Sequence, residues 1–206
     1  TLDGSSAASD VYKRQEIYRN SQFGGKHPLS IPRVSAVLDL IRTIGICDKE
    51  EYQTGPCAKP ELLKRFHTPE YISVLKKTEA SQEISEMDAK TYNIGSLSNP
   101  VFPEMFKRPA TSVGSSLLAA DLVNDGGRAY SLGGGLHHGM AGYANGFCFL
   151  NDLAFAINRL RELGIQRVAY IDLDAHHCDG VTAAFPEDEN LFIVSAHEEK
   201  RWPFTG

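Results

Sequence analysis

A dense group of acidic and histidine residues directly follows a short apolar run late in the chain. The run spans residues 168–171 (Val, Ala, Tyr, Ile), which predicts a short, fully buried strand of a parallel sheet. The segment after it carries three aspartates and two histidines: Asp172, Asp174, His176, His177 and Asp179. On an extended chain Asp172, Asp174 and His176 share one side, because side chains alternate along a strand. Such a group suits a divalent metal better than helix capping, since uncompensated charges beside a core strand are costly.

A glycine-rich segment upstream, residues 133–139, carries a second pair of histidines. Three glycines follow the apolar run 129–132 and let the backbone bend sharply. His137 and His138 come next, where they could transfer protons or bind a metal. Taken alone, the segment fits a flexible turn with incidental histidines equally well. It lacks the glycine spacing of a nucleotide-binding loop.

A helix predicted over residues 152–163 joins the two segments. Asn151 or Asp152 can cap its start, and its apolar residues recur at helical spacing. The order strand, helix, strand is a βαβ crossover, which predicts that the runs 129–132 and 168–171 are parallel neighbours. Both clusters would then meet at the carboxyl ends of parallel strands, where open α/β sheets place their active sites.

Three motifs in this order resemble the zinc-dependent histone deacetylase family, whose bacterial members include acetoin-utilisation proteins and acetylpolyamine amidohydrolases. The motifs are residues 133–138, 146–152 and 172–180, and the similarity runs from about Ile17 to the last residue. The resemblance implies an α/β, three-layer arginase/deacetylase-like fold with a central parallel sheet. It also implies a zinc-dependent amidohydrolase (deacetylase) that cleaves an acetyl or short acyl amide from a lysine-like or polyamine amine with metal-activated water.

The resemblance also assigns roles to individual residues. Asp174 and His176 are implied as zinc ligands. The implied catalytic residues are His137, which acts on the attacking water, His138, which delivers a proton to the leaving amine, and their respective partners Asp172 and Asp179. The physical logic agrees, because a carboxylate on the far ring nitrogen fixes the tautomer and raises the basicity of the imidazole.

Further positions match the family's substrate channel and a second ion site. Gly146 and Phe147 would form one wall of the channel and Trp202 the opposite wall, although core packing is a plain alternative for Trp202. A structural potassium ion is implied at Asp172, Ser195 and Ala196, mainly through backbone carbonyls. Arg33 resembles an arginine that lines the cavity beneath the active site.

Two positions depart from the family pattern. Ser98 stands where the family usually has an aspartate that clamps the substrate backbone, and a serine still accepts a hydrogen bond but without charge. We therefore keep Ser98 as a candidate substrate-binding residue. Cys178 replaces a common glycine, and we interpret it as a small buried hydrophobe.

The resemblance leads to expectations about both ends of the chain. Family members continue past the residue that corresponds to Gly206, with an aspartate as third zinc ligand and a tyrosine that stabilises the oxyanion. We therefore expect residues 16–206 to be the N-terminal part of one deacetylase-like catalytic domain, truncated at the C-terminus and inactive or nearly so. Residues 1–10 are small and polar without a strand period, and we expect residues 1–15 to be a poorly ordered or non-native lead-in.

The composition of the chain limits the kinds of partner that we expect it to bind. A net charge of −5 and a pI near 5.8 argue against direct nucleic-acid binding. The sequence contains no apolar run of membrane-spanning length, so we expect no membrane partner. Its four cysteines show neither a Cys-x-x-Cys pattern nor disulfide-dense spacing, so we expect a cytoplasmic protein. The expected partner is an acylated amine: an acetyl-lysine peptide, an acetylpolyamine or a small metabolite.

Two other functions stay open. A manganese ureohydrolase of the arginase type shares the fold and an Asp-Ala-His segment, but it needs an aspartate two residues after the histidine, where this chain has Cys178. A non-catalytic relative that binds a metal or an acyl ligand is the other alternative, because a third zinc ligand and the tyrosine have no counterpart in the sequence.

Overall fold

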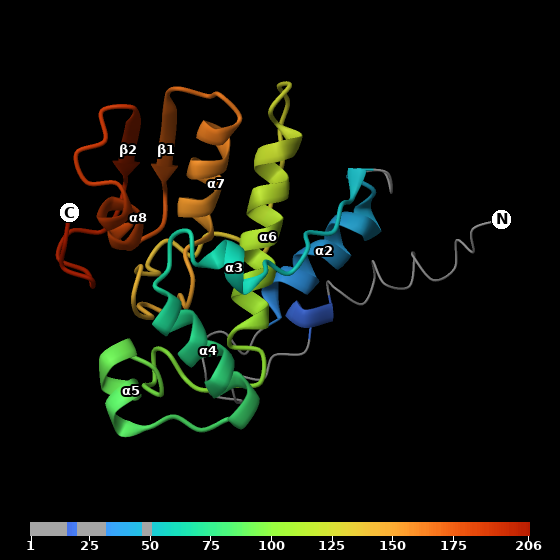
Figure 1. Ribbon diagram of the computed structural model, residues 1–206. Coiled ribbons are helices and arrows are strands. Elements are labelled where there is room, and N and C mark those ends of the chain that lie inside the picture. Colours follow the sequence, from blue (N-terminus) through green and yellow to red (C-terminus); the bar gives the residue numbers. More distant parts are fainter. Residues whose placement is uncertain (1–15, 20–31, 47–50) are drawn as a thin grey trace.

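The computed structural model describes residues 16–19, 32–46 and 51–206 (Figure 1). The predicted lead-in, residues 1–15, lies outside the described residues. The elements are η1 (Glu16–Tyr18), α2 (Arg33–Ile44), α3 (Pro60–Leu63), α4 (Pro69–Ser81), α5 (Glu86–Tyr92), α6 (Lys107–Leu122), α7 (Asp152–Glu162), β1 (Val168–Asp172), α8 (Asp179–Ala184) and β2 (Leu191–Ser195). Over these ranges, none of the helices is both long and apolar enough to cross a bilayer.

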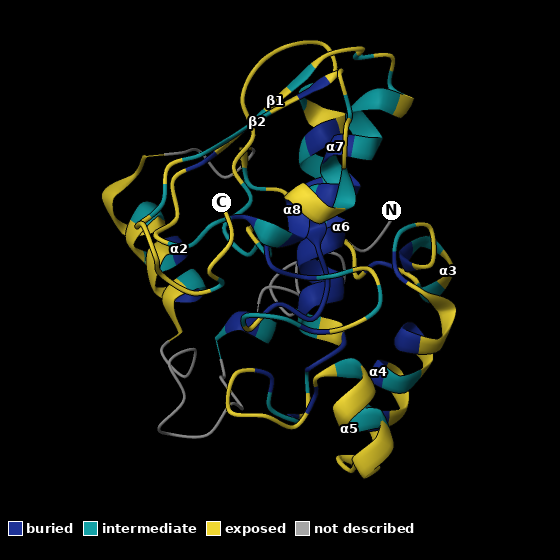
Figure 2. Cartoon of the chain, turned by 90° about the vertical axis from the view of Figure 1, so that its left-hand side faces the viewer, coloured by how far each residue is buried: buried dark blue, intermediate teal, exposed yellow. Residues whose placement is uncertain are grey.

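Helix α6 runs through the centre of the molecule and is buried over much of its length (Figure 2). Its small residues allow neighbouring backbone to approach closely, and a Cβ atom at Gly114 would lie only 1.7 Å from the carbonyl oxygen of Pro56. Helix α7 packs alongside α6. The main core gathers α3, α4, α6, the start of α7 and the loop before it, and its larger members are Leu63, Tyr71, Ile72, Leu75, Phe102, Met105, Phe106, Val113, Phe149, Leu150 and Phe155.

The start of α7 matches the sequence prediction closely. Asn151 is the N-cap, and its Oδ1 accepts a hydrogen bond of 3.0 Å from the N–H of Ala154. Asp152 is the first helical residue, where a negative charge is favourable, and its side chain is turned toward the glycine-rich segment. At the start of α7, Asn151 therefore caps the helix, and Asp152 contacts the glycine-rich segment.

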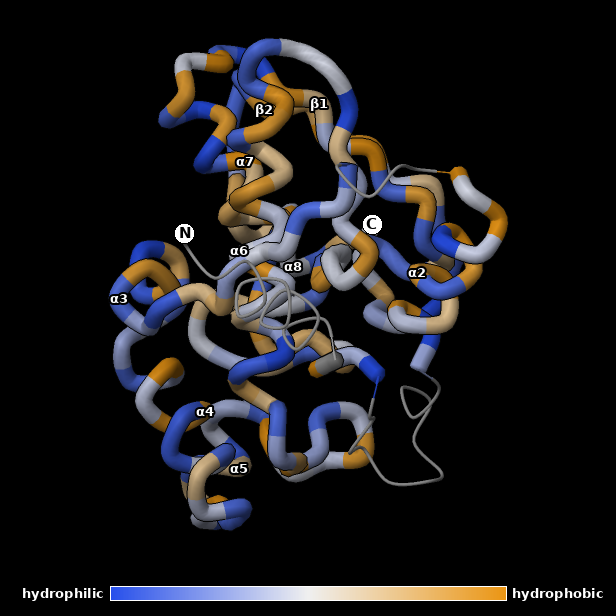
Figure 3. Tube along the Cα trace, turned by 90° about the vertical axis from the view of Figure 1, so that its right-hand side faces the viewer, coloured by the Kyte–Doolittle hydropathy of each residue, from blue (hydrophilic) through white to orange (hydrophobic). Residues whose placement is uncertain are grey.

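Strands β1 and β2 form a parallel pair in which Val168 faces Leu191 and Asp172 faces Ser195. Helices α7 and α8 contribute to a small core on one face of this pair. The other face is open in the described structure, because Ile171 is 63% exposed and Phe192 67% exposed. Figure 3 shows hydrophobic positions along both strands. The prediction of a fully buried strand at 168–171 is therefore wrong, since the described helices cover only one face.

Residues 129–132 do not form a strand, and β1 pairs with β2 instead. The prediction that the runs 129–132 and 168–171 are neighbouring strands is therefore wrong. A strand exists only where a neighbour completes its hydrogen-bonded ladder, and sequential strands neighbour each other often but not always. The crossover that does bring two strands together here runs through α8, between β1 and β2.

Candidate active site

His137 is held by a carboxylate at the end of β1. The Nδ1–H of His137 donates to Asp172 Oδ2 across 2.6 Å, and the hydroxyl of Tyr170 donates to the same oxygen. The N–H of Asp174 donates to the other oxygen across 2.9 Å. Burial alone would raise the pKa of Asp172, but these hydrogen bonds outweigh it and hold the pKa at about 2.

The same pairing acts on the imidazole. Burial works to lower the pKa of His137, yet the hydrogen bond and charge of Asp172, with the charges of Asp174 and Asp179, outweigh burial and raise the pKa. A raised pKa makes the ring a better proton acceptor. Because Nδ1 is occupied by Asp172, the Nε2 atom is the one available for chemistry.

His138 forms a second dyad with the first residue of α8. Its Nδ1 lies 2.6 Å from Asp179 Oδ1, and the rings of His137 and His138 are 4.0 Å apart between centroids. Asn145 Nδ2 donates to the other oxygen of Asp179 across 2.9 Å, and the N–H of Gly180 donates to Oδ1 across 2.8 Å. The carboxylate is thereby fixed from both sides, and the two dyads stand next to each other.

Asp174 and His176 offer mixed oxygen and nitrogen donors beside the dyads. Asp174 Oδ1 lies 2.9 Å from His176 Nδ1 and 3.9 Å from His137 Nε2. Burial would raise the pKa of Asp174, but hydrogen bonds from His176 and the nearby imidazoles outweigh it and lower the pKa. This pair fits two ligand positions of a zinc ion, which takes His nitrogen and Asp oxygen atoms. Across the described ranges, no group of three or more His, Cys, Asp or Glu side chains is arranged to hold a metal.

The two dyad histidines and the donor pair line one cleft of about 630 Å³. Phe147 and Trp202 line it together with His137, His138, Asp174 and His176. The Trp202 ring lies 4.7 Å from the His138 ring, and a Cβ atom at Gly146 would lie 2.4 Å from Trp202. The indole therefore packs directly on the glycine backbone. Trp202 is 38% exposed, so the alternative that it packs in the core is wrong.

The outlying site predictions are placed as follows. Arg33 lines the same cleft, from the start of α2. Ser98 is exposed and is not among the residues that line the cleft, whereas its neighbour Asn99 is fully buried. Cys178 is fully buried and burial raises the pKa of its thiol, which agrees with a small hydrophobe.

The residues expected at a potassium site lie beside the end of β1. The N–H of Ala196 donates to the backbone oxygen of Asp172 across 2.9 Å, so this carbonyl already accepts one hydrogen bond. The hydroxyl of Ser195 pairs with His197 Nδ1 across 2.9 Å. Potassium binding here stays a prediction.

Asp152 is a site residue that sequence reasoning missed. Its fully buried carboxylate accepts hydrogen bonds from the N–H of Leu136 (2.7 Å), the N–H of Gly135 (3.2 Å) and the hydroxyl of Ser116 (2.5 Å). Burial outweighs these bonds and raises its pKa. The carboxylate fixes the backbone just before the two histidines. The sequence offers no signal for this role, because an aspartate at a helix start also fits simple capping.

His67 is the second missed residue, and it ties down the backbone after the histidine pair. Its Nδ1–H donates to the carbonyl of Met140 (3.1 Å) and lies near that of Ala141 (3.3 Å), while its Nε2 accepts from the N–H of Asn151 (3.2 Å). Asn151 Nδ2 in turn donates to the carbonyl of Gly139 across 2.9 Å. Burial lowers the pKa of His67 to about 4, so the ring is neutral at pH 7.

Gly180 joins the two sequence motifs at the backbone. A Cβ atom there would lie 2.6 Å from the carbonyl oxygen of His137 and 2.8 Å from that of Gly139. The N–H of Val181 donates to the carbonyl of His137 across 3.2 Å. The start of α8 is thus packed directly against the histidine pair.

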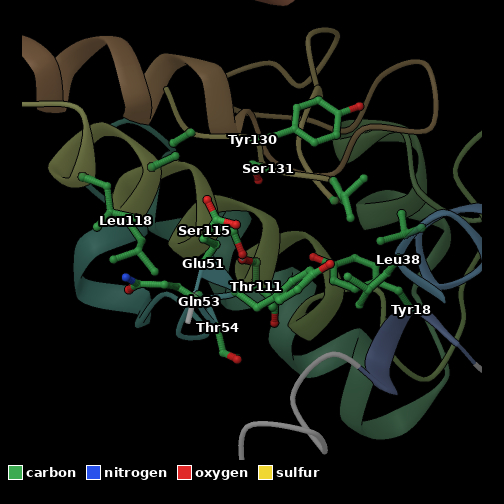
Figure 4. A pocket seen from close by; sticks show the side chains of 18 of the residues that line it. Tyr18, Leu38, Glu51, Gln53, Thr54, Thr111, Ser115, Leu118, Tyr130 and Ser131 are labelled. Carbon is green, nitrogen blue, oxygen red and sulfur yellow. The ribbon is translucent and has the colours of Figure 1, made fainter. Parts of the chain in front are cut away.

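A second cavity, of about 340 Å³, lies between α2, α6 and residues 128–133 (Figure 4). Tyr18, Leu38 and Leu118 contribute to its walls, and within the described part the hydroxyl of Ser131 is buried without a hydrogen-bond partner. None of the dyad or metal-donor side chains lines this cavity. The chemistry therefore belongs to the larger cleft.

Comparison with known proteins identifies the family. The protein-family model of the histone deacetylase domain matches residues 27–206 of the sequence. The acetoin utilization protein AcuC of Bacillus subtilis (strain 168) is 39% identical over 198 residues, which cover 95% of this chain and 51% of that protein. AcuC of Staphylococcus xylosus is 35% identical over 197 residues, covering 92% and 51%. The chain thus spans about half the length of the curated relatives it matches.

Solved structures give the same result for the fold. An HDAC homologue from Aquifex aeolicus is 38% identical with a TM-score of 0.86, and the match covers 91% of this chain and 51% of that one. An HDAC homologue complexed with SAHA is 37% identical with a TM-score of 0.87, covering 93% and 52%. These matches confirm the predicted arginase/deacetylase-like α/β fold. The chain belongs to the histone deacetylase domain family.

Proposed function

We propose that this chain supplies the catalytic dyads of a zinc-dependent amidohydrolase that removes an acetyl or short acyl group from a lysine-like or polyamine amine. The observation that carries the proposal is the pair of His–Asp dyads beside two metal donors in one cleft walled by aromatic rings. A similar HDAC homologue is complexed with SAHA, which supports a cleft that binds a small ligand. Since the chain spans about half of its relatives, the activity of the whole protein is part of this proposal.

The donor pair defines where the metal would be held. Asp174 and His176 would bind zinc through Oδ1 and Nδ1, and a third protein ligand is part of the proposal because catalytic zinc sites usually have three. When bound, zinc supplies Lewis acidity that polarises the amide carbonyl and lowers the pKa of a water molecule. All other steps fall to side chains of the cleft.

The two dyads divide the proton transfers between them. His137 takes a proton from the attacking water at Nε2, while Asp172 holds its Nδ1–H and stabilises the positive ring. His138 delivers a proton from Nε2 to the leaving amine, with Asp179 holding its Nδ1–H. Phe147 and Trp202 would enclose the alkyl stem of the amine and exclude water.

The test measures zinc content and hydrolysis of an acetyl-lysine peptide together, in the whole protein of which this chain is part. The variant His138→Ala should lose hydrolysis by about a hundredfold or more and keep its zinc. His177→Ala is the matched control, because its Nδ1 pairs with the hydroxyl of Thr205 across 2.8 Å and it is not among the residues that line the cleft. It should retain both properties. Manganese-dependent release of urea would contradict the proposal.

A non-catalytic relative that binds a metal or an acyl ligand is the second candidate. It is favoured by the number of metal donors, which is two in the described part of the cleft. Zinc binding without turnover of any acetylated amine would favour it over the amidohydrolase. Acetyl-lysine peptides, acetylpolyamines and small acetylated metabolites are the substrate classes to compare.

The proposed compartment is the cytoplasm. Cys148 and Cys178 are free thiols, as a reducing compartment would keep them. Cys47 lies outside the described residues. Secretion in an oxidised form with intermolecular disulfides would contradict this proposal.

A further inference from the structure

Phe147, the proposed aromatic wall, sits in an unusual backbone turn. Asn145 and Cys148 exchange two backbone hydrogen bonds, of 3.0 and 2.8 Å, around a two-residue loop. Both loop residues have positive φ, +50° at Gly146 and +66° at Phe147, as a type I′ turn requires. Glycine adopts this conformation freely, but a phenylalanine does not. Something outside the turn must therefore hold Phe147 in place.

Asn99 makes the contact that can do so. Its Oδ1 accepts the N–H of Phe147 across 3.1 Å. Its Nδ2 donates to the carbonyl of Ala144 across 3.3 Å and to that of Asn93 across 3.0 Å. One side-chain amide thus holds the chain on both sides of the turn. Its oxygen accepts one hydrogen bond, and the two hydrogens of its NH₂ group serve the other two.

Asn99 is itself rigidly placed. It is fully buried, its N–H donates to the hydroxyl of Ser96 across 3.1 Å, and its carbonyl accepts the N–H of Gly95 across 2.7 Å. A buried amide with a fixed backbone has little freedom to reorient. Its side chain therefore transmits a defined position to the turn.

We propose that Asn99 is a positioning residue that holds Phe147 in its left-handed conformation at the wall of the cleft. The proposal rests on the proposed function in one respect, because only that function makes Phe147 a substrate contact. Asn99 acts through Phe147 and touches no reacting atom. We expected Ser98 to be the functional residue of this segment. In the proposal its buried neighbour Asn99 has that place instead.

The test measures amide hydrogen exchange of Phe147 by NMR in two variants. Asn99→Ala removes the acceptor and should speed exchange at Phe147 by about fivefold or more, and move its backbone carbon shifts away from left-handed values. Asn99→Asp keeps an acceptor oxygen and should restore much of the protection. Exchange at Phe147 within twofold of the unmodified chain in Asn99→Ala would overturn the proposal.

Asn93→Gly is the matched control. Asn93 Nδ2 donates to the same Ala144 carbonyl across 2.9 Å, whereas the N–H of Phe147 is accepted by Asn99. Glycine tolerates its φ of +52°, so the substitution removes only the side-chain contact. Phe147 exchange should stay within twofold, and an acceleration equal to that of Asn99→Ala would overturn the assignment to Asn99.

If Asn99→Ala does not fold, the unmodified chain decides the question. A scalar coupling through the hydrogen bond is expected between the Phe147 amide nitrogen and Asn99 Cγ. Its absence, in a spectrum that detects the coupling between Cys148 N and the Asn145 carbonyl, would overturn the proposal. Neither this coupling nor the exchange rates depends on enzymatic activity.

The functional arm uses the whole protein, of which this chain is part, and the acetyl-lysine peptide. Asn99→Ala should raise KM severalfold while kcat falls less, because the stem of the substrate loses a wall and the dyads stay intact. Asn93→Gly should change neither. Absence of turnover in the unmodified whole protein would count against the proposed function alone, since the exchange data judge Asn99 separately. An unchanged KM in an active Asn99→Ala variant would overturn the positioning role.

Discussion

The buried imidazole of His67 should make the stability of the chain depend on pH. In the neutral ring Nε2 accepts the N–H of Asn151, so a proton on Nε2 would face another donor in a buried site. Burial lowers the pKa from 6.5 to about 4. The unfolded chain therefore binds a proton more readily than the folded chain between these values. By linkage, about 3 kcal/mol of stability is present above pH 6.5 and is lost as the pH falls to 4.

The assay is urea unfolding of the unmodified chain and of His67→Gln at several pH values between 4 and 7. Glutamine does not titrate, so the difference in the free energy of unfolding between the two proteins should shrink by about 3 kcal/mol from pH 7 to pH 4. His137 has a raised pKa and acts in the opposite sense, with stabilisation present below pH 6.5 and lost as the pH rises through its folded value. Both proteins retain His137, so its contribution cancels.

Tyr71→Phe provides the control for a general loss of packing. Tyr71 is fully buried near His67, with ring centroids 5.9 Å apart, and its hydroxyl donates to the carbonyl of Phe149 across 2.7 Å. Burial raises its pKa well above the ordinary value, so it does not titrate between pH 4 and 7. This variant should lower stability by an amount that is constant with pH. If the difference in the free energy of unfolding between the unmodified chain and His67→Gln is also constant between pH 4 and pH 7, the reasoning is refuted.

Two further pairs of substitutions test the structure of the site. Asp152→Asn should cost about 1–3 kcal/mol in the urea assay, because the carboxylate accepts two backbone N–H groups, and Ser116→Ala, which removes only one donor to it, should cost less. Gly146→Ala should shift the fluorescence of Trp202, the single tryptophan, since a Cβ atom would lie 2.4 Å from its ring. Gly45→Ala has a similar φ of +66° with no neighbour within 4 Å, and an equal shift there would contradict this explanation.

The sequence predicted the helices better than the sheet. Helix α7 follows the predicted range and cap because local signals, a capping side chain and a helical apolar period, decide it. The strand expected at residues 129–132 is absent, because pairing depends on a distant partner rather than on the apolar run itself. The prediction that β1 is fully buried failed for the same reason, since a run of four apolar residues does not reveal how many faces of the strand are covered.

The dense motifs of the site could be found in the sequence, but the groups that support them could not. The structure brings His137 against Asp172 and His138 against Asp179, the pairs that the family resemblance implied. Their supports are single buried polar residues far away in sequence. Asn99, for example, stands beside a proline in a polar loop, a context in which most asparagines only form turns. Its role arises from burial and from a partner 48 positions away, neither of which a local pattern contains.

The close contact at Gly180 has a consequence for how the site can change. Because the backbone of α8 touches the carbonyl of His137 directly, Asp179 and the histidine pair belong to one packed unit. Any side chain at position 180 would widen the spacing between the two motifs and disturb both dyads at once. The geometries of the two dyads are therefore not separately adjustable by substitutions here. Phe147 and Trp202, which are 37% and 38% exposed, are not part of this packed unit.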